Sequence, residues 1–323
     1  MDIWRVQLKP APAEGITYQD VLNFCKDKGI IGVGWYLVET HEDDYDALKS
    51  AIERIPEYAG SNGKHTAAIK AVNAVRSMKT GDLVWTRLAE NAADYYLCRV
   101  GDKLWKDRNV TDEHRRHDIG NFVSAEWVRV GTEDMVPGKV VNNFCARGTA
   151  QHVYEVERVS KYIWNKYSGD NLQKYEMTPF TMDDFWNAIG SEELESLILL
   201  YLQTKGYYIY SSTLKISTAR YEVIMVSHDG KHKCLPQVKR NTTLDVADYI
   251  EDVKDGDEVY LFTTSEQYGS TKHDKVHCIS KCEIEDFISS NYSILPESIR
   301  YWVDMINKSL PRFSPWQAFH FDI

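Results

Sequence analysis

One short stretch constrains the fold of this chain more than any other. Two β-rich runs, Tyr221–Val226 and Leu235–Arg240, flank the dipeptide Asp229-Gly230, which is the strongest short-range signal for a hairpin with a two-residue loop. If this dipeptide forms the loop, Glu222 lies directly opposite Gln237, with Cβ atoms roughly 4.5–5.5 Å apart. The stretch therefore predicts both a pair of antiparallel strands and their register.

That register gathers polar groups on one face of the sheet. Lys239 follows Gln237 by two residues, so it shares the same face and lies diagonal to Glu222, roughly 7–8 Å away. Val238 points to the other face, as a core residue should. A carboxylate, an amide oxygen and an ammonium group are thus expected on one patch, which could hold a hard cation and a phosphodiester.

Length and composition set the remaining bounds. A chain of 323 residues suggests two domains, each long enough to bury a core. The net charge of −10 argues against a protein that coats nucleic acid nonspecifically, although local grooves still allow a nuclease. Six scattered cysteines without a CxxC pair are typical of reduced thiols. No apolar run approaches membrane-spanning length. We therefore expect a cytoplasmic protein with no membrane association.

The first half of the chain is patterned as short strands separated by turns, with helices between them. Expected strands are Ile3–Leu8, Leu83–Arg87, Tyr95–Val100, Phe122–Val130 and a further one from Val140 onward. Short strands at this spacing predict a small curled sheet or barrel with helices packed outside.

Aromatic motifs in this half resemble those of PUA-like domains of the EVE kind. The motifs are Gly34-Trp35, Gly81–Trp85, Tyr95–Val100, Glu126-Trp127 and Val136–Gly138. The resemblance covers about residues 1–165 and implies a barrel that accepts a nucleobase, often a modified one flipped from a duplex. The residues that it implies for stacking on the base are Trp35, Trp85 and Trp127. Those that it implies for polar contacts with the base or a phosphate are Arg87, Asp118 and Asn121. The alternative remains that these tryptophans, being on strands, are core residues.

The second half predicts an α/β domain around a central mixed sheet. A helix begins near Ser191 and ends at Lys205-Gly206, with Glu195 at the edge of its buried face. The hairpin follows, and then a helical stretch and the strands Glu258–Thr263 and Val276–Ile279. A helix, a hairpin, a helix and a strand in this order favour a sheet covered by helices.

This order, together with Glu195, Glu222 and the tripeptide Gln237-Val238-Lys239, resembles the PD-(D/E)XK nucleases of the Mrr-like branch over about residues 190–290. The resemblance implies Mg²⁺- or Mn²⁺-dependent phosphodiester hydrolysis. Glu222 would be the main metal ligand, Gln237 the second, and Glu195 an additional carboxylate, while Lys239 would stabilise the phosphate or orient water. The chain departs from the family in having Glu222 where Asp is usual and Gln237 in place of an acid.

Glu222 and Lys239 also fit a simpler arrangement without catalysis. They could form an ordinary cross-strand ion pair on a solvated sheet face, contributing roughly 0.2–1 kcal/mol. His273, His277, Cys278 and Cys282 suggest zinc ligands by residue type. His277 and Cys278 point to opposite faces if Val276–Ile279 is a strand, so we do not expect a zinc site.

Together these observations predict an α+β chain. Residues 1–165 form a PUA/EVE-like base-reading barrel, residues 166–190 a linker, and residues 191–323 a restriction-endonuclease-like domain. The expected function is that of an endonuclease directed to modified or foreign DNA, in the manner of modification-dependent restriction and antiviral defence. A homodimer is one way for such an enzyme to cut both strands. The alternatives are an inactive nucleic-acid-binding protein on a nuclease fold, and a reader-nuclease that acts on RNA.

Overall fold

The computed structural model describes residues 1–35, 45–55, 63–88, 94–146, 148–213, 221–254 and 256–309. The chain divides into two compact units, Met1–Phe180 and Thr181–Ile323. Their boundary falls inside the segment predicted as a linker. Trp164 donates a hydrogen bond from its indole nitrogen to the carbonyl of Gln173 (2.9 Å), so the first part of that segment packs onto the first unit.

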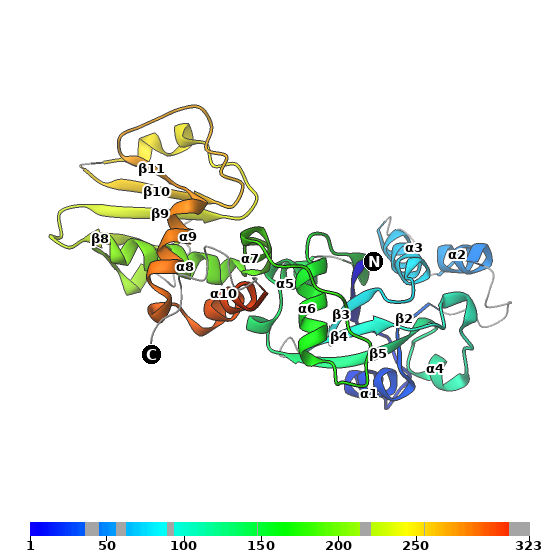
Figure 1. The fold of residues 1–323 in the computed structure, drawn as a ribbon. Coiled ribbons are helices and arrows are strands. Elements are labelled where there is room, and N and C mark those ends of the chain that lie inside the picture. Colours follow the sequence, from blue (N-terminus) through cyan, green and yellow to red (C-terminus); the bar gives the residue numbers. More distant parts are fainter. Residues whose placement is uncertain are drawn as a thin grey trace. The chain divides into compact units, whose positions relative to one another are not determined.

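The first unit contains a mixed six-stranded sheet that curls into a half-barrel (Figure 1). Its strands are β1 (Ile3–Leu8), β2 (Ile30–Val33), β3 (Leu83–Leu88), β4 (Tyr95–Val100), β5 (Asn121–Gly131) and β6 (Ala150–His152). Their order is β2-β5-β4-β3-β1-β6. Only the β1–β3 pair among these named strands is parallel. The curled sheet predicted for this half is therefore present.

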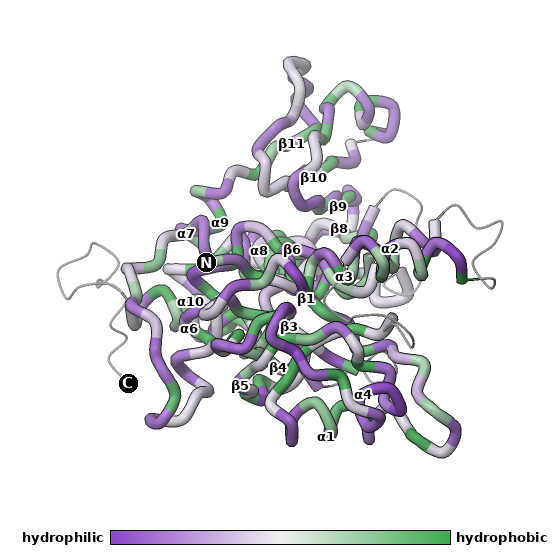
Figure 2. Tube along the Cα trace, turned by 90° about the vertical axis from the view of Figure 1, so that its right-hand side faces the viewer, coloured by the Kyte–Doolittle hydropathy of each residue, from purple (hydrophilic) through white to green (hydrophobic). Residues whose placement is uncertain are grey.

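Helices accompany each part of this sheet. They are α1 (Tyr18–Lys28), α2 (Tyr45–Glu53), α3 (Lys64–Ser77), α4 (Asp112–Arg116), α5 (Gly138–Cys145) and α6 (Glu157–Tyr167). Local sequence fixes α1: Thr17 forms a capping box with Asp20, and Gly29 ends the helix in a left-handed conformation (φ 60°). The side chains of Val21, Leu22 and others of α1 join those of α3, β1 and β2 in one apolar core. In contrast, α4 is hydrophilic along its length and appears purple in Figure 2.

The prediction of a strand from Val140 onward is wrong, because these residues form helix α5. Pro137 is the N-cap of helix α5, and Val140 and Phe144 are buried on one side of that helix. Their i, i+4 spacing is helical, and a proline just before the first turn suits a helix start because its missing N–H would have had no partner there.

The second unit contains a mixed five-stranded sheet with helices (Figure 1). Its strands are β7 (Tyr207–Ile209), β8 (Met225–Ser227), β9 (Lys233–Lys239), β10 (Glu258–Thr263) and β11 (Val276–Ile279). Their order is β11-β10-β9-β8-β7. The β9–β10 and β10–β11 pairs are parallel, and the β7–β8 and β8–β9 pairs are antiparallel. The predicted central mixed sheet is thus confirmed.

The helical elements of this unit cover both faces of its sheet. They are α7 (Met182–Ala188), α8 (Ser191–Thr204), α9 (Lys281–Ser290), α10 (Glu297–Ser309) and the 3₁₀ helix η5 (Val246–Asp252). The apolar residues of η5 pack with Val259 and Leu261 of β10 on one face. On the other face, Phe262 lies 5.7 Å from the Trp186 ring of α7. Strand alternation therefore places neighbouring residues of β10 in different environments.

Among the described residues, no helix has both the length and the apolar composition needed to cross a membrane.

Candidate functional site

The hairpin of the second unit has the predicted register near its turn. Met225 pairs with Cys234 and Val226 pairs with Lys233, which are the partners that a turn about Asp229-Gly230 requires. Since a slip by one residue would exchange the two faces of the strand, this register places Lys239 on the predicted face. Met225 and Cys234 are both fully buried, so their neighbours on each strand face the other way.

The turn itself is wider than the predicted two-residue loop. The backbone N–H of Gly230 donates to the carbonyl of Ser227 (2.8 Å), so the tight turn is centred on His228 and Asp229. The Asp229 carboxylate accepts hydrogen bonds from the Ser227 hydroxyl (2.6 Å) and from the Lys231 backbone N–H (3.1 Å). This arrangement is a turn closed by an Asp side chain, and Gly230 follows it with φ 71°.

Pro236 ends the regular ladder between β8 and β9. The backbone N–H of Ser227 donates to the carbonyl of His232 (2.8 Å). Hydrogen-bonded pairs alternate every two residues in an antiparallel ladder, so the continuation would need an N–H at position 236 facing Val223. Proline has no N–H to donate. Strand β8 accordingly begins only at Met225 and does not include Val223.

The direct pairing predicted for Glu222 and Gln237 is therefore wrong. The backbone N–H of Glu222 donates instead to the carbonyl of Pro236 (3.1 Å), one residue away from the predicted partner. Gln237 is only 4% exposed and pairs with Leu261 of β10. Its amide thus belongs to the buried part of the sheet face that carries Lys239.

The predicted meeting of the acid and the lysine does occur. The Lys239 ammonium group donates to a Glu222 carboxylate oxygen (3.0 Å). The Glu222 side chain is 18% exposed and that of Lys239 is 45% exposed. The Glu222 side chain is therefore largely sheltered, whereas nearly half of the Lys239 side chain is exposed.

Glu195 comes close to this pair from helix α8. Burial raises the pKa of its half-buried carboxyl group, the negative charge of Glu222 raises it further, and the positive charge of Lys239 opposes both. Because such charge effects fall off with distance, Glu195 belongs to the same electrostatic cluster. Three of the four residues predicted to act together are thus near one another, and they come from separate elements.

The donor set of this cluster fits a hard cation. Glu195 and Glu222 supply carboxylates, and backbone carbonyls of β9 and the Gln237 amide oxygen lie nearby in the chain. Among the residues that the structure describes, no group of three or more His, Cys, Asp or Glu side chains gathers as a metal site. An ion here would have two carboxylates at most, which suits Mg²⁺ because it keeps several of its waters.

Arg240, which the sequence reasoning missed, anchors the end of β9. Its guanidinium group donates to the carbonyls of Trp186 (2.5 Å) and Ile189 at the end of α7. Burial lowers its pKa to about 10. These contacts hold the end of β9 against the end of α7. Arg240 therefore fixes the backbone position of the adjacent Lys239, whose side chain contacts Glu222. A cation directly after the tripeptide was the only sequence signal for this role.

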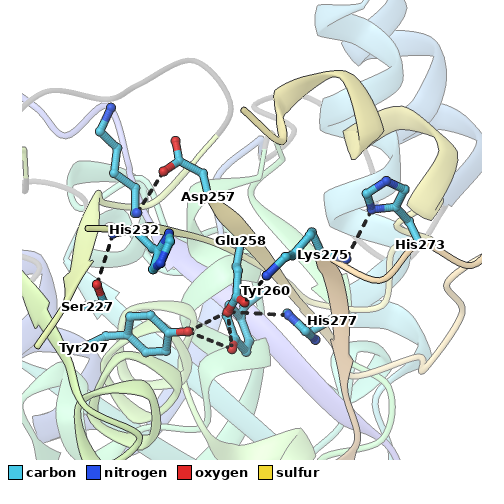
Figure 3. A network of polar contacts seen from close by, with 10 residues as sticks. Tyr207, Ser227, His232, Asp257, Glu258, Tyr260, His273, Lys275 and His277 are labelled. Carbon is cyan, nitrogen blue, oxygen red and sulfur yellow. Dashed lines mark hydrogen bonds and ion pairs between the residues drawn. The ribbon is translucent and has the colours of Figure 1, made fainter. Parts of the chain in front are cut away.

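A second polar network lies on the same sheet (Figure 3). The Glu258 carboxylate accepts hydrogen bonds from Tyr207 (2.6 Å), Tyr260 (3.0 Å) and Lys275 (3.1 Å). His277 lies 3.6 Å from the same carboxylate and stacks on Tyr260. These contacts link β7, β10 and β11, which explains the network as a structural tie between strands.

The two networks occupy different ends and faces of the sheet. Glu258 pairs with Cys234 at the start of β9, whereas Thr263 pairs with Lys239 at its end. Paired residues of parallel strands share a face, and Cys234 and Lys239 are separated by an odd number of positions, so Glu258 and Lys239 face opposite ways. The Lys275–Glu258 contact is nevertheless almost identical in length and exposure to the Lys239–Glu222 contact.

In the first unit, three of the predicted base-reading residues come together. The side-chain amide of the fully buried Asn121 donates to the carbonyls of Gly34 (2.5 Å) and Trp35 (2.7 Å) and accepts from the Trp105 indole (2.9 Å). Asp118 accepts a hydrogen bond from the Ala11 N–H (2.7 Å). Asn121 and Asp118 thus hold the backbone around Gly34-Trp35.

This corner of the first unit is strained. Trp35 and Asp118 both have left-handed backbone conformations (φ 60° and 51°), which are costly for residues other than glycine. A Cβ atom on Gly34 would lie 2.4 Å from an Asp118 carboxylate oxygen, so only glycine fits there. Burial raises the pKa of Asp118, against hydrogen bonds from the Ala11 and Trp35 N–H groups. The cavity lined by these residues measures about 30 Å³, which is room for water but not for a base.

The remaining residues predicted to read a base lie elsewhere. Trp85 is fully buried and donates to the Ser160 hydroxyl (3.0 Å), so it offers no face for stacking, contrary to the prediction. Arg87 donates to the Tyr95 hydroxyl (2.8 Å) on the same face of β3 as Trp85. Trp127 is half-buried and donates to the carbonyl of Ile30 (3.1 Å). The predicted set is thus divided between the two faces of the sheet.

A larger hollow of about 530 Å³ in this unit was not predicted. Its lining includes Lys28, Arg108, His114 and Phe122. The His114 and Phe122 rings stack at 4.6 Å. None of the six residues nominated for base reading lines it. The basic and aromatic residues that do so are spread over the sequence without a motif to join them.

Comparison with known proteins adds no assignment. No family model matches the chain, no curated protein is significantly similar to it, and no solved structure resembles it significantly.

Proposed function

We propose that this chain is a Mg²⁺-dependent nuclease that hydrolyses phosphodiester bonds of DNA at Glu222, Lys239 and Glu195. The observation that carries the proposal is the contact of Lys239 with Glu222 beside a further carboxyl group. The Lys239 ammonium group contacts Glu222 at 3.0 Å, and the charges of both residues act on the pKa of Glu195, which lies on a helix remote in sequence.

A simple surface ion pair would not require this arrangement. A Glu–Lys pair across two strands needs no third charge, and a second carboxylate near Glu222 adds repulsion between like charges. Such repulsion is relieved when a divalent cation binds between the carboxylates. The presence of Glu195 therefore favours a cation site over a solvated ion pair.

Each residue has a defined task in this proposal. A bound Mg²⁺ would act as a Lewis acid on the phosphate, held by Glu222 and Glu195 and by an oxygen of Gln237 or of the β9 backbone. Lys239, whose side chain is partly exposed, donates hydrogen bonds to the phosphate and stabilises the charge that develops on it. Arg240 acts through Lys239 by fixing the end of β9.

The substrate and biological role extend the proposal. The first unit would bind a base at its strained corner around Trp35 and Asp118, since local backbone strain is typical of functional sites. The second unit would then cut the DNA. Since the described cavity is too small for a base, binding would have to open it. Selection of modified or foreign DNA in the cytoplasm would then serve defence, and one site per chain would require dimerisation or repeated nicking to cut both strands.

Replacing the carboxylate tests the catalytic part of this proposal. Glu222→Gln keeps the size of the side chain and removes its charge. We expect the rate of DNA cleavage in Mg²⁺ or Mn²⁺ to fall on the order of 100-fold or more, with the fold retained by circular dichroism. Glu192→Gln, at an exposed position of the same helix as Glu195, is the matched control and should cleave as the wild type does.

One observation favours a second candidate, a nucleic-acid-binding protein without catalysis. Gln237 is a neutral, buried residue where the nucleases that the sequence resembles have an acid. If the wild-type chain binds DNA or RNA but cuts neither in Mg²⁺ or Mn²⁺, this second candidate replaces the first. Cleavage of RNA alone would change the substrate but leave the three-residue site in place.

A further inference from the structure

Among the residues that the structure describes, no helix packs on one face of the C-terminal sheet beside β7 and β8. Val223 and Met225 of the hairpin point to the other face and are fully buried. Ile224 and Val226 point to the open face and are only half-buried. The open face thus has apolar side chains that η5 and its cluster, which pack against β9, β10 and β11, do not fully cover.

Two exposed tyrosines extend this open face onto strand β7. Tyr208 is 54% exposed and Tyr210 is 47% exposed, and both are among the few large hydrophobic residues of the described chain that are so accessible. Tyr208 pairs with Val226, and the Tyr210 N–H donates to the carbonyl of Ile224 (3.0 Å). Both tyrosines therefore share the face of Ile224 and Val226, because cross-strand partners point the same way.

The same face ends at the candidate catalytic centre. Lys239 lies on this face, because it follows Lys233, the partner of Val226, by an even number of positions along β9. Glu222 in turn contacts Lys239. Tyr210 and Tyr208 are the cross-strand neighbours of Ile224 and Val226, which follow Glu222 by two and four residues in the chain.

The local charge favours a polyanion despite the acidic chain. The segment Tyr221–Lys239 contains Lys231, Lys233 and Lys239 against Glu222 and Asp229, whereas the whole chain carries −10. Lys233 is exposed at the start of β9, directly opposite Val226. Aromatic faces beside cationic side chains are the combination that binds single-stranded nucleic acid.

We propose that this open face of β7, β8 and β9 binds unpaired DNA, whose bases stack on Tyr208 and Tyr210 while its backbone runs toward Glu222 and Lys239. This inference rests on the proposed nuclease function and defines its substrate as DNA with an unpaired strand at the cut. A paired duplex buries its base faces within the stack, so it cannot use the two tyrosine rings in this way.

Binding without cleavage tests the proposal. The affinity of the full chain for a fluorescent single-stranded oligonucleotide and for the matching duplex is measured in EDTA. Tyr208→Ala and Tyr210→Ala should each weaken single-strand binding about tenfold and leave duplex binding unchanged. Tyr208→Phe and Tyr210→Phe retain the rings and serve as matched controls. They should bind as the wild type does, even though the first loses the 2.8 Å contact between the Tyr208 hydroxyl and His228.

Three results would overturn the inference. Unchanged single-strand affinity in both alanine variants removes the tyrosines from the surface. An equal loss for single strand and duplex shows a general nucleic-acid contact rather than recognition of unpaired bases. A loss in the phenylalanine variants shows that the hydroxyls matter and not the rings. A cleavage assay distinguishes failure of the nuclease proposal from failure of this inference. If the chain binds single strands through the two rings but does not cut DNA in Mg²⁺, the binding surface is supported and the nuclease proposal is wrong.

Discussion

Asn121 organises the strained corner of the first unit. Its side chain, which is fully buried, satisfies the carbonyls of Gly34 and Trp35 and the indole N–H of Trp105 at the same time. No apolar side chain can replace these three contacts. Asn121 thus joins distant parts of the chain and, together with Asp118, holds the left-handed backbone at Trp35.

Asn121→Ala should destabilise the first unit by about 2–4 kcal/mol, because it leaves several buried polar groups without partners. Chemical denaturation monitored by tryptophan fluorescence measures the change. Asn23→Ala, at an exposed position on α1, is the control and should change the free energy of unfolding by less than about 0.5 kcal/mol. Equal effects of the two substitutions would contradict the organising role of Asn121.

Glu258 gives the second unit a pH dependence that can be separated from catalysis. Burial raises its pKa, but hydrogen bonds from Tyr207, Lys275 and Tyr260 lower it by more, and the net direction is down. The folded state therefore binds the proton less tightly than the unfolded chain does. The resulting stabilisation is fully present above the unfolded pKa of about 4.3 and is lost as the pH falls through the lower folded pKa.

Glu258→Gln should remove this dependence. The free energy of unfolding of the wild type minus that of the variant is expected to be largest near neutral pH and to shrink below about pH 4. Denaturation curves between pH 3 and pH 7 measure this difference. A difference that stays constant over the whole range would show that the carboxylate charge is not what the network stabilises.

At the scale of elements, the hairpin between β8 and β9 has the predicted register near its turn, but its loop is longer than the predicted two residues. Gly230 has φ 71°, and a Cβ atom added there would meet nothing within 4 Å. The cost of a side chain at this position is therefore one of backbone conformation alone. Gly63, at the start of α3, has similar open space but φ −102°, so it provides a matched comparison.

Gly230→Ala should destabilise the second unit by about 1–2 kcal/mol, the cost of a left-handed conformation for a residue with a Cβ atom. Gly63→Ala should cost less than Gly230→Ala, because the backbone at Gly63 is not left-handed. Thermal unfolding of the two variants beside the wild type provides the test. The described turn would be wrong if the two variants had equal midpoints.

Most strands could be predicted because alternation and turn residues are local signals. The predicted strands Ile3–Leu8, Tyr95–Val100, Glu258–Thr263 and Val276–Ile279 have the bounds seen in the structure. The strand from Val140 onward failed because a short apolar run before Phe144 fits a helix as well as a strand. The proline that precedes α5 was the one local signal that favoured the helix.

The candidate site was predictable in part for the same reason. Alternation placed Glu222 and Lys239 on one face, and they do meet. The predicted pairing of Glu222 with Gln237 depended on a regular ladder of hydrogen bonds, and Pro236 has no N–H to continue it. The Arg240 anchor on α7 and the contacts of Asn121 are long-range, so no local pattern reveals them.

At the scale of the whole molecule, the chain is two compact units, each with its own mixed sheet. The strained corner at Trp35 and the charge cluster at Glu222 belong to different units. The central claim, that the second unit cuts DNA, can therefore be tested independently of what the first unit reads.

The most direct test uses two lysines of the same sheet. Lys239 contacts Glu222 at 3.0 Å with 45% exposure, and Lys275 contacts Glu258 at 3.1 Å with 44% exposure. The two alanine variants thus remove nearly identical ion pairs at opposite ends of the sheet. The measurement is the rate at which the full chain cleaves a DNA substrate with an unpaired strand in the presence of Mg²⁺. We predict that Lys239→Ala lowers this rate at least about 100-fold while Lys275→Ala leaves it unchanged. Equal rates for the two variants, or no Mg²⁺-dependent cleavage by the wild type, would contradict the account.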